Sequence, residues 1–272
     1  MLKRAWLILL ALLAVSCASS MSPMEPPQVE HGFLLRSVEL GGSEHPFSVW
    51  VPPGYTGESP WPAILFLHGA GERGDEGLMS TQVGLGYAIR RAPERWPAIV
   101  VFPQSPRERQ WAGDAERIAL AALAQVEKEF RIDPDRVYLT GLSMGGAGTW
   151  SIANQYPEKF AAVAPICGWI VPMEGRPEYQ RDLRVSKIDP EAPYESVARR
   201  LRDVPIWIWH GSEDRSVPVE ESRRMAAALA SAGAREARYD ELEGVGHNSW
   251  DAAYLVSGLA EWMMKQGLGT RD

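Results

Sequence analysis

Short apolar runs and helical repeats alternate along this chain. The runs Ala63–Leu67 and Ala98–Phe102 are continuously apolar, as is typical of strands buried on both faces of a sheet. Over Asp114–Phe130, apolar residues recur at the spacing of a helix. Applied to the whole chain, the pattern predicts strands at Phe33–Leu40, Pro46–Val51, Ala63–Leu67, Ala98–Phe102, Arg136–Thr140, Phe160–Ile166, Val204–Trp209 and Ala237–Leu242, and helices at Asp114–Phe130, Gly146–Tyr156, Glu220–Ala232 and Trp250–Gln266.

This alternation indicates an α/β fold with a mostly parallel, eight-stranded sheet that carries helices on both faces. A length of 272 residues, 45% of them hydrophobic, is enough for one such domain, and a split into two small domains is not needed. The rhythm breaks at residues 168–196, which are irregular and rich in proline. We expect an insertion there, of the kind that often forms a lid or a binding loop.

The first residues have the pattern of a targeting segment. A short basic start precedes the apolar run Ala5–Val15, which is too short to span a bilayer. We expect residues 1–16 to be an export signal, with an uncleaved anchor as the alternative. The sequence ending at Cys17 resembles the lipobox of bacterial lipoproteins, which implies lipid attachment there and a flexible tether over residues 17–32. The expected location is a bacterial cell-envelope membrane, held by lipid, or the outside of the cell.

Composition argues against several other classes of protein. The net charge of -7 gives no support for nucleic-acid binding, which usually needs a basic surface. Two cysteines are too few for a disulfide scaffold or a cysteine-rich zinc module. We therefore expect one domain over residues 33–272 without a nucleic-acid partner. Membrane contact is expected through the N-terminal lipid alone, and the oligomeric state stays open.

One motif carries the chemistry of a nucleophile. Gly141–Gly145 reads GLSMG, a G-x-S-x-G pattern, and lies between a predicted strand and a predicted helix. In that context the pattern forms a nucleophile elbow, because the glycines allow a tight and strained turn around the serine. We therefore predict Ser143 as a nucleophile. A glycine–serine turn without chemistry is the alternative.

A serine hydroxyl needs a base that accepts its proton, and an acid orients that base. In the predicted architecture, the acid and then the histidine follow the serine along the chain. Asp214 lies in the loop after the predicted strand Val204–Trp209, and His247 lies in a glycine-rich loop after the last strand. We predict Asp214 as the acid and His247 as the base. The adjacent Glu213 stays open as an alternative acid.

Four further histidines and two further acids are not predicted to act as the base or the acid. They are His31, His45, His68, His210, Asp240 and Asp251. His68 and His210 end buried strands, so we expect each to bond the backbone of a neighbouring loop.

A glycine-rich loop, His68–Gly74, follows the predicted strand Ala63–Leu67 and reads HGAGERG. Acyl transfer requires backbone N–H donors directed at the developing oxyanion. In this architecture one donor is the residue after the nucleophile, here Met144, and another comes from the loop after the third strand, where we predict Ala70. The loop lacks the spacing of dinucleotide-binding and phosphate-binding loops. This chemistry requires no metal and no cofactor, and we predict neither.

Taken together, the motifs resemble the α/β-hydrolase superfamily over about residues 33–264. The segments that carry the resemblance are Leu67–Gly74, Phe102–Pro106, Gly141–Gly146, His210–Pro218 and Gly246–His247. They are most similar to secreted esterases of the polyhydroxybutyrate depolymerase, feruloyl esterase and small carboxylesterase group. The resemblance implies a serine hydrolase that cleaves carboxylic esters through an acyl-enzyme. The family's nucleophile, acid and base correspond to Ser143, Asp214 and His247.

The sequence says less about the substrate. Gln104, Trp111 and Trp169 lie in loops expected beside the site, and we predict that they line the pocket. Tryptophan stacks on aromatic or sugar groups, which favours a small-molecule or carbohydrate-linked ester, but it also fills cores. Two rival functions stay open: a serine peptidase of the prolyl-oligopeptidase type, and a non-catalytic lipoprotein that binds ligands at the cell surface.

Overall fold

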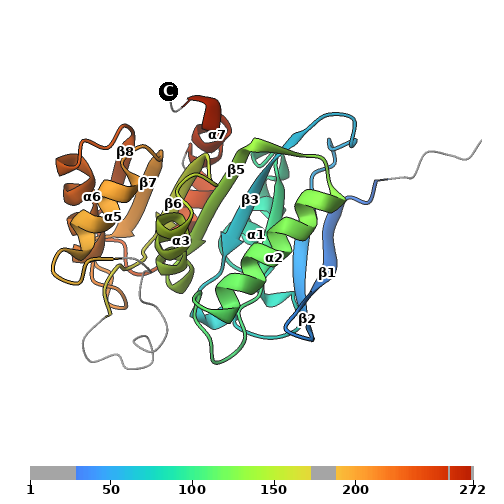
Figure 1. Ribbon diagram of the computed structural model, residues 1–272, viewed down its shortest axis with the longest axis horizontal. Helices are drawn as coiled ribbons and strands as arrows, with labels where there is room; N and C mark the ends of the chain where they lie inside the picture. The colour runs from blue at the N-terminus through green and yellow to red at the C-terminus, as the bar shows by residue number, and fades with distance from the viewer. Residues whose placement is uncertain (1–28, 173–187, 257, 271–272) are drawn as a thin grey trace, which may run out of the picture.

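The computed structural model describes residues 29–172, 188–256 and 258–270 of the chain. Its centre is an eight-stranded sheet with the order β1-β2-β4-β3-β5-β6-β7-β8 (Figure 1). The strands are β1 (Gly32–Leu40), β2 (Ser43–Val51), β3 (Trp61–Leu67), β4 (Ile99–Pro103), β5 (Ile132–Leu142), β6 (Ala162–Ile166), β7 (Ile206–Gly211) and β8 (Ala237–Leu242). The pairs β1–β2 and β2–β4 are antiparallel, and all other neighbours are parallel. The predicted sheet is confirmed.

Helices cover both faces of the sheet, and each face has its own hydrophobic core. They are α1 (Leu85–Arg91), α2 (Asp114–Glu129), α3 (Met144–Gln155), α5 (Pro193–Leu201), α6 (Glu220–Ser231) and α7 (Leu259–Met264). On one face, α2, α3, α5 and α6 bury apolar residues such as Leu123 and Trp150. On the other face, α1 and α7 contribute Ile89 and Leu259 to a core that includes Phe66. The predicted two-sided covering is also confirmed.

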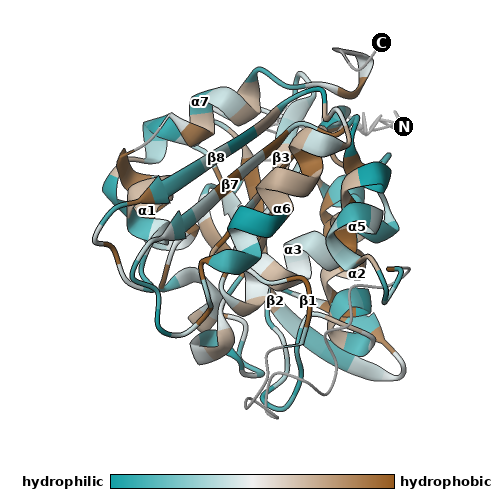
Figure 2. Ribbon diagram, turned by 90° about the vertical axis from the view of Figure 1, so that its left-hand side faces the viewer, coloured by the Kyte–Doolittle hydropathy of each residue, from teal (hydrophilic) through white to brown (hydrophobic). Residues whose placement is uncertain are grey.

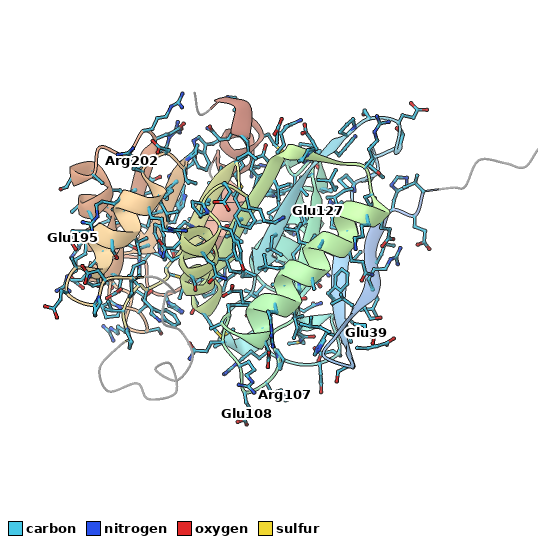
Figure 3. The ribbon with its side chains drawn as sticks, viewed as in Figure 1. Glu39, Arg107, Glu108, Glu127, Glu195 and Arg202 are labelled. Carbon is cyan, nitrogen blue, oxygen red and sulfur yellow. The ribbon has the colours of Figure 1, made fainter. Side chains whose placement is uncertain are left out.

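The central and edge strands differ in burial, as their sequences predict. All residues of β3 after Trp61 are buried, because β4 and β5 flank the strand and helices cover both faces. The edge strand β8 is charged and only partly buried. Figure 2 shows hydrophilic stretches along the ribbons of β8 and α6 at this end of the molecule. Charged side chains such as Glu195 and Arg202 project outward (Figure 3).

Three helical segments differ from the prediction. The pattern does not predict α1, which has only seven residues, or α5, which overlaps the stretch expected to be irregular. Pro193 stands in the first turn of α5, where proline favours a helix start. The expected final helix over residues 250–266 is instead a π-helical turn, Ala252–Val256, followed by α7. Gly258, at the N-cap of α7, lies between the two helical segments.

Parts of the predicted domain organisation lie outside the described residues. These parts are the expected signal at residues 1–16, Cys17 with most of the tether, and residues 173–187 of the expected insertion. Across the three described ranges, none of the helices combines the length and the apolar character that a membrane span requires.

Candidate active site

Ser143 lies in a strained turn between β5 and α3. Its φ of 55° is in the left-handed region, which residues with a side chain rarely adopt. Its backbone N–H donates to the carbonyl oxygen of Ile166 at 2.9 Å, which ties the turn to β6. A Cβ on Gly145 would collide with the carbonyl oxygen of Leu67, so this position requires glycine. The turn has the geometry of a nucleophile elbow and presents the hydroxyl at the carboxyl ends of the strands.

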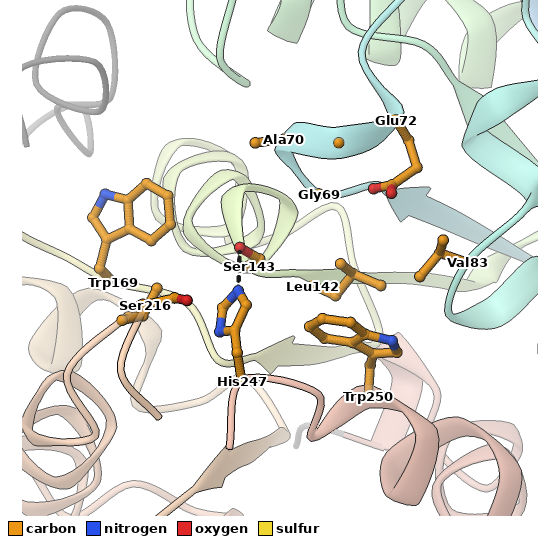
Figure 4. A pocket seen from close by; sticks show the side chains of 12 residues that line it. Gly69, Ala70, Glu72, Val83, Leu142, Ser143, Trp169, Ser216, His247 and Trp250 are labelled. Carbon is orange, nitrogen blue, oxygen red and sulfur yellow. Dashed lines mark hydrogen bonds between the residues drawn. The ribbon is translucent and has the colours of Figure 1, made fainter. Parts of the chain in front are cut away.

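Three side chains from different loops meet at this end of the sheet. Ser143 Oγ lies 2.9 Å from His247 Nε2 (Figure 4), and His247 Nδ1 lies 2.7 Å from Asp214 Oδ2. Asp214 follows β7 and His247 follows β8, so parallel strands deliver both residues to the same edge as Ser143. The structure thus brings together the residues that the sequence predicts as nucleophile, acid and base.

The Asp214 side chain is fully buried and well supplied with donors. Its Oδ1 accepts the backbone N–H groups of Ser216 at 2.8 Å and Val217 at 2.9 Å. Burial alone would raise the pKa of Asp214. Hydrogen bonds from His210, His247 and Val217 outweigh burial and hold that pKa well below its usual range. Asp214 is therefore a fixed negative charge beside the imidazole of His247.

Opposing influences also set the pKa of His247. Burial lowers it, but the hydrogen bond to Asp214 and the contact with Cys167 outweigh burial, so the pKa of His247 is raised above its ordinary value. Cys167 follows β6 with a φ of 40°, and its thiol is buried. The sequence pattern assigns Cys167 to no site. Its position directly after a buried strand, at the same edge of the sheet, is the signal that could have indicated this contact.

A second contact that the sequence does not reveal joins His210 to Asp214. His210 Nε2 lies 3.2 Å from Asp214 Oδ2 and 3.1 Å from the carbonyl oxygen of Val217. Since both partners are acceptors, we assign the ring proton to Nε2. Nδ1, 2.7 Å from Ser222 Oγ, then accepts the hydroxyl hydrogen. His210 bonds loop backbone as expected and, in addition, donates to Asp214.

The other acids near the site differ from Asp214 in their surroundings. Glu213, adjacent in sequence to the buried carboxylate, is exposed. Asp240 accepts a hydrogen bond from the indole of Trp207, and Asp251 accepts one from Asn248. The geometry therefore favours Asp214 over each of them as the partner of the histidine.

Both predicted oxyanion donors border the site. Met144 is the first residue of α3, so its N–H has no acceptor within the helix. This N–H lies at the positive, N-terminal end of the helix dipole, next to Ser143. Ala70 begins a 3₁₀ turn, Ala70–Glu72, directly after β3 and lines the same pocket as Ser143. An oxyanion between these two backbone groups would be close to the serine.

The pocket beside Ser143 has a volume of about 200 Å³. It is lined by Gly69, Ala70, Gly71, Glu72, Val83, Leu142, Ser143, Trp169, Ser216, Val217, His247 and Trp250. Figure 4 shows Trp169 on one side of Ser143, and Trp250 with Leu142 on the other. The pocket walls therefore combine apolar side chains with polar groups, and they include Trp169 as the sequence predicts.

Gln104 and Trp111 do not line this pocket, contrary to the prediction. Both are buried and support the glycine-rich loop from behind. Gln104 Nε2 donates to the carbonyl oxygen of Glu72 at 2.9 Å, and Trp111 Nε1 donates to that of His68 at 2.9 Å. His68 is itself bonded to backbone, accepting from Ser105 N–H at 2.9 Å. Loop sequence alone does not show which side chains fold back under the loop.

Among the described residues, one group of side chains has the composition of a metal site. It comprises Cys167, Asp214 and His247, whose ligand atoms lie within 4.8 Å of one another. Asp214 and His247 are already joined by a hydrogen bond of 2.7 Å. A metal ion would therefore have to replace the contact that orients the histidine.

A family model described as the prolyl oligopeptidase family matches residues 108–266, which is more than half of the chain. The chain belongs to the prolyl oligopeptidase family. The match contains Ser143, Asp214 and His247, whereas the loop with Ala70 lies before it. The predicted membership of the α/β-hydrolase superfamily is confirmed.

Individual proteins that the chain resembles are named as esterases. NocK of Nocardia uniformis subsp. tsuyamanensis is 27% identical over 222 residues, which are 76% of this chain and 62% of NocK. Esterase YjfP of Escherichia coli K12 is 24% identical over 205 residues, 65% of this chain and 78% of YjfP. The crystal structure of a thermostable esterase superposes with a TM-score of 0.71 at 30% identity over 86% of this chain and 63% of that one. The chain thus spans less than two thirds of NocK and of the thermostable esterase.

Proposed function

We propose that this chain is a serine hydrolase that cleaves carboxylic esters through an acyl-enzyme. The observation that carries the proposal is the chain of contacts from Ser143 Oγ through His247 to Asp214, at 2.9 and 2.7 Å, beside a pocket. A serine hydroxyl becomes nucleophilic when a hydrogen-bonded histidine accepts its proton. The names of the related esterases support the same class of reaction.

The reaction has two acyl-transfer steps. Ser143 Oγ attacks the ester carbonyl carbon while His247 Nε2 accepts the hydroxyl proton, and Asp214 stabilises the imidazolium that forms. The N–H groups of Ala70 and Met144 donate to the oxyanion of the tetrahedral intermediate. The ester bond then breaks, the alcohol takes the proton from His247, and the acyl group stays on the serine. Water, deprotonated by the same histidine, attacks the acyl-enzyme. The bond between the acyl carbon and Ser143 Oγ then breaks, His247 returns the proton to Oγ, and the acid is released.

We further propose a small-molecule or carbohydrate-linked ester as substrate. The indole rings of Trp169 and Trp250 line the pocket and offer flat apolar faces of the kind that pack on aromatic or sugar rings. Peptide hydrolysis is a second candidate, because the family model that the chain matches is named for a peptidase. A panel of paired esters and amides with the same acyl group separates the two.

The test compares the full-length chain with Ser143→Ala on p-nitrophenyl esters from acetate to long acyl chains. We expect hydrolysis and fluorophosphonate labelling of the parent, and a loss of several orders of magnitude in rate in the variant. Ser231→Ala, an exposed serine at the end of α6, is the matched control and should keep both properties. A folded parent that neither hydrolyses an ester nor reacts with the probe would favour the surface-binding function instead.

We also propose export of the chain and lipid attachment at Cys17. The support is the sequence pattern of residues 1–17 and a relative from Arthroderma benhamiae, 26% identical over 210 residues, that is named a secreted protein. Mass spectrometry of the mature protein tests this. Cleavage before Cys17 with a diacylglycerol-sized addition is the expected result, and Cys17→Ser should abolish the addition. Recovery of an uncleaved chain would contradict the proposal.

A further inference from the structure

Glu72 places a carboxylate in the wall of the pocket. It is the last residue of the turn Ala70–Glu72, and Figure 4 shows its carboxyl group close to Gly69 on the side of the pocket that also holds Leu142 and Val83. A Cβ built on Gly69 would lie 3.1 Å from Glu72 Oε2 and 3.7 Å from Ser143 Cβ. The carboxylate and the serine are therefore no farther apart than the sum of these two distances, which is within the length of a small substrate.

The surroundings of Glu72 give it no counter-charge. Within the described part of the chain, no lysine or arginine forms an ion pair with it, and none lines the pocket. Burial raises the pKa of Glu72, and only the backbone N–H groups of Gly69 and of Glu72 itself oppose this effect. A half-buried carboxylate that lacks a charged partner has acceptor capacity left for a ligand.

Neighbouring charged residues of the same loop are arranged differently. Glu76 accepts a hydrogen bond from the amide of Gln104 at 2.9 Å. Arg73 Nε donates to the carbonyl oxygen of Ala70 at 2.9 Å, so it supports the backbone of the turn. Asp75 is exposed to solvent. Of these loop residues, Glu72 alone lines the pocket.

We propose that Glu72 accepts a hydrogen bond from a hydroxyl or ammonium group of the substrate, so that this enzyme selects esters carrying such a donor. The inference rests on the ester hydrolase function proposed above. The apolar side chains of Val83, Leu142 and Trp250 on this side of the pocket reduce competition from water, which strengthens a charge-assisted hydrogen bond. A substrate with a carboxylate at the same place is repelled, because no cation in the pocket offsets Glu72.

The experiment uses two matched series of esters at a constant pH, with hydrolysis followed by base titration. The acyl series is methyl hexanoate, methyl 6-hydroxyhexanoate, methyl 6-aminohexanoate and monomethyl adipate. The alcohol series is the acetates of pentanol, pentanediol, aminopentanol and 5-hydroxypentanoate. In at least one series, we expect the hydroxyl or ammonium ester to exceed the unsubstituted ester in kcat/KM by about tenfold to a hundredfold. We expect the carboxylate ester to be the slowest.

Glu72→Gln removes the charge and keeps the shape. Relative to the unsubstituted ester, the ammonium preference and the carboxylate penalty should both disappear in this variant. A hydroxyl preference should fall less, since the amide oxygen of glutamine still accepts a hydrogen bond. Asp75→Asn removes the same charge from an exposed position outside the pocket and should leave every ratio unchanged. A preference for hydroxyl alone or for ammonium alone identifies which donor the site takes.

Two results would overturn the inference. One is equal ratios in the parent and in Glu72→Gln. The other is a uniform loss on all esters, which would mean that Glu72 only holds the turn through Gly69. Failure of the proposed function is separate: in that case the parent hydrolyses no ester and Ser143 does not react with a fluorophosphonate. Labelling of Ser143 without any discrimination among esters overturns the role of Glu72 alone.

Discussion

At the scale of single residues, the pH dependence of the reaction reports the contact between His247 and Asp214. The histidine must be neutral to act as a base, and its pKa is raised above its ordinary value, so kcat/KM should rise with pH through an apparent pKa above about 6.5. Asp214→Asn removes the negative charge while burial still lowers the pKa of His247. We expect this rise to move to lower pH and kcat to fall by roughly three to four orders of magnitude. A pH–rate profile of an ester substrate measures both. If its acidic limb, the part where the rate rises with pH, did not move, the assignment of Asp214 would be contradicted.

His210 should affect the same pH profile in the opposite direction. His210→Phe keeps a ring of similar shape and removes the donor to Asp214. A carboxylate with one donor fewer attracts the proton of His247 more strongly, so we expect the limb to move to higher pH and kcat to fall by about tenfold or more. His210→Gln restores a donor and should recover part of the loss. A fall in thermal stability without any shift of the limb would indicate a purely structural histidine.

Sequence alone predicted three residues of the candidate site that the structure brings together. The order of Ser143, Asp214 and His247 along the chain follows from where parallel strands end, so pattern and motif were enough to predict that they meet. Trp111 and Gln104 show the limit. Both were expected to line the pocket because they lie in the right loops, but burial beneath a loop depends on contacts that no local pattern encodes.

At the scale of elements, the turn between β5 and α3 depends on glycine packing. Gly145→Ala would drive a Cβ into the carbonyl oxygen of Leu67 at the end of β3, and backbone cannot move there without disturbing the sheet. We expect a loss of about 3 kcal/mol in the free energy of unfolding, measured by chemical denaturation. Gly71→Ala is the control, because a Cβ there meets open space. Equal stability of the two variants would show that the turn is less closely packed than its contacts indicate.

The elements themselves were predictable where the hydrophobic pattern was long or continuous. Strands buried on both faces, such as β3 and β4, consist almost entirely of apolar residues. In α2, buried residues recur at helical spacing along most of the helix. The pattern does not predict α1, because its seven residues form less than two helical turns and are too few to show a repeat. The break before α7 escaped prediction because a π-helical turn keeps the residue types of a helix and changes only their hydrogen bonds.

At the scale of the whole molecule, one sheet joins two cores and the site. The loops that carry Ala70, Ser143, Asp214 and His247 follow β3, β5, β7 and β8, so the site exists only where these strands are paired. The cores on the two faces share the same strands, since successive side chains of a strand point to opposite faces. Damage to either core should therefore reach the site through the sheet.

Leu123→Ala in α2 and Leu259→Ala in α7 test this coupling, one on each face. Both leucines are fully buried, and each substitution should cost about 2–5 kcal/mol in the free energy of unfolding. Leu78→Ala, at a side chain that is 51% exposed, is the matched control and should change little.

Because the cores share one sheet, the change in tryptophan fluorescence and the loss of fluorophosphonate labelling of Ser143 should occur at the same denaturant concentration in every variant. If Leu259→Ala lost labelling at a lower denaturant concentration than fluorescence, the face with α7 would unfold separately. The geometry of the site would then depend on that face alone.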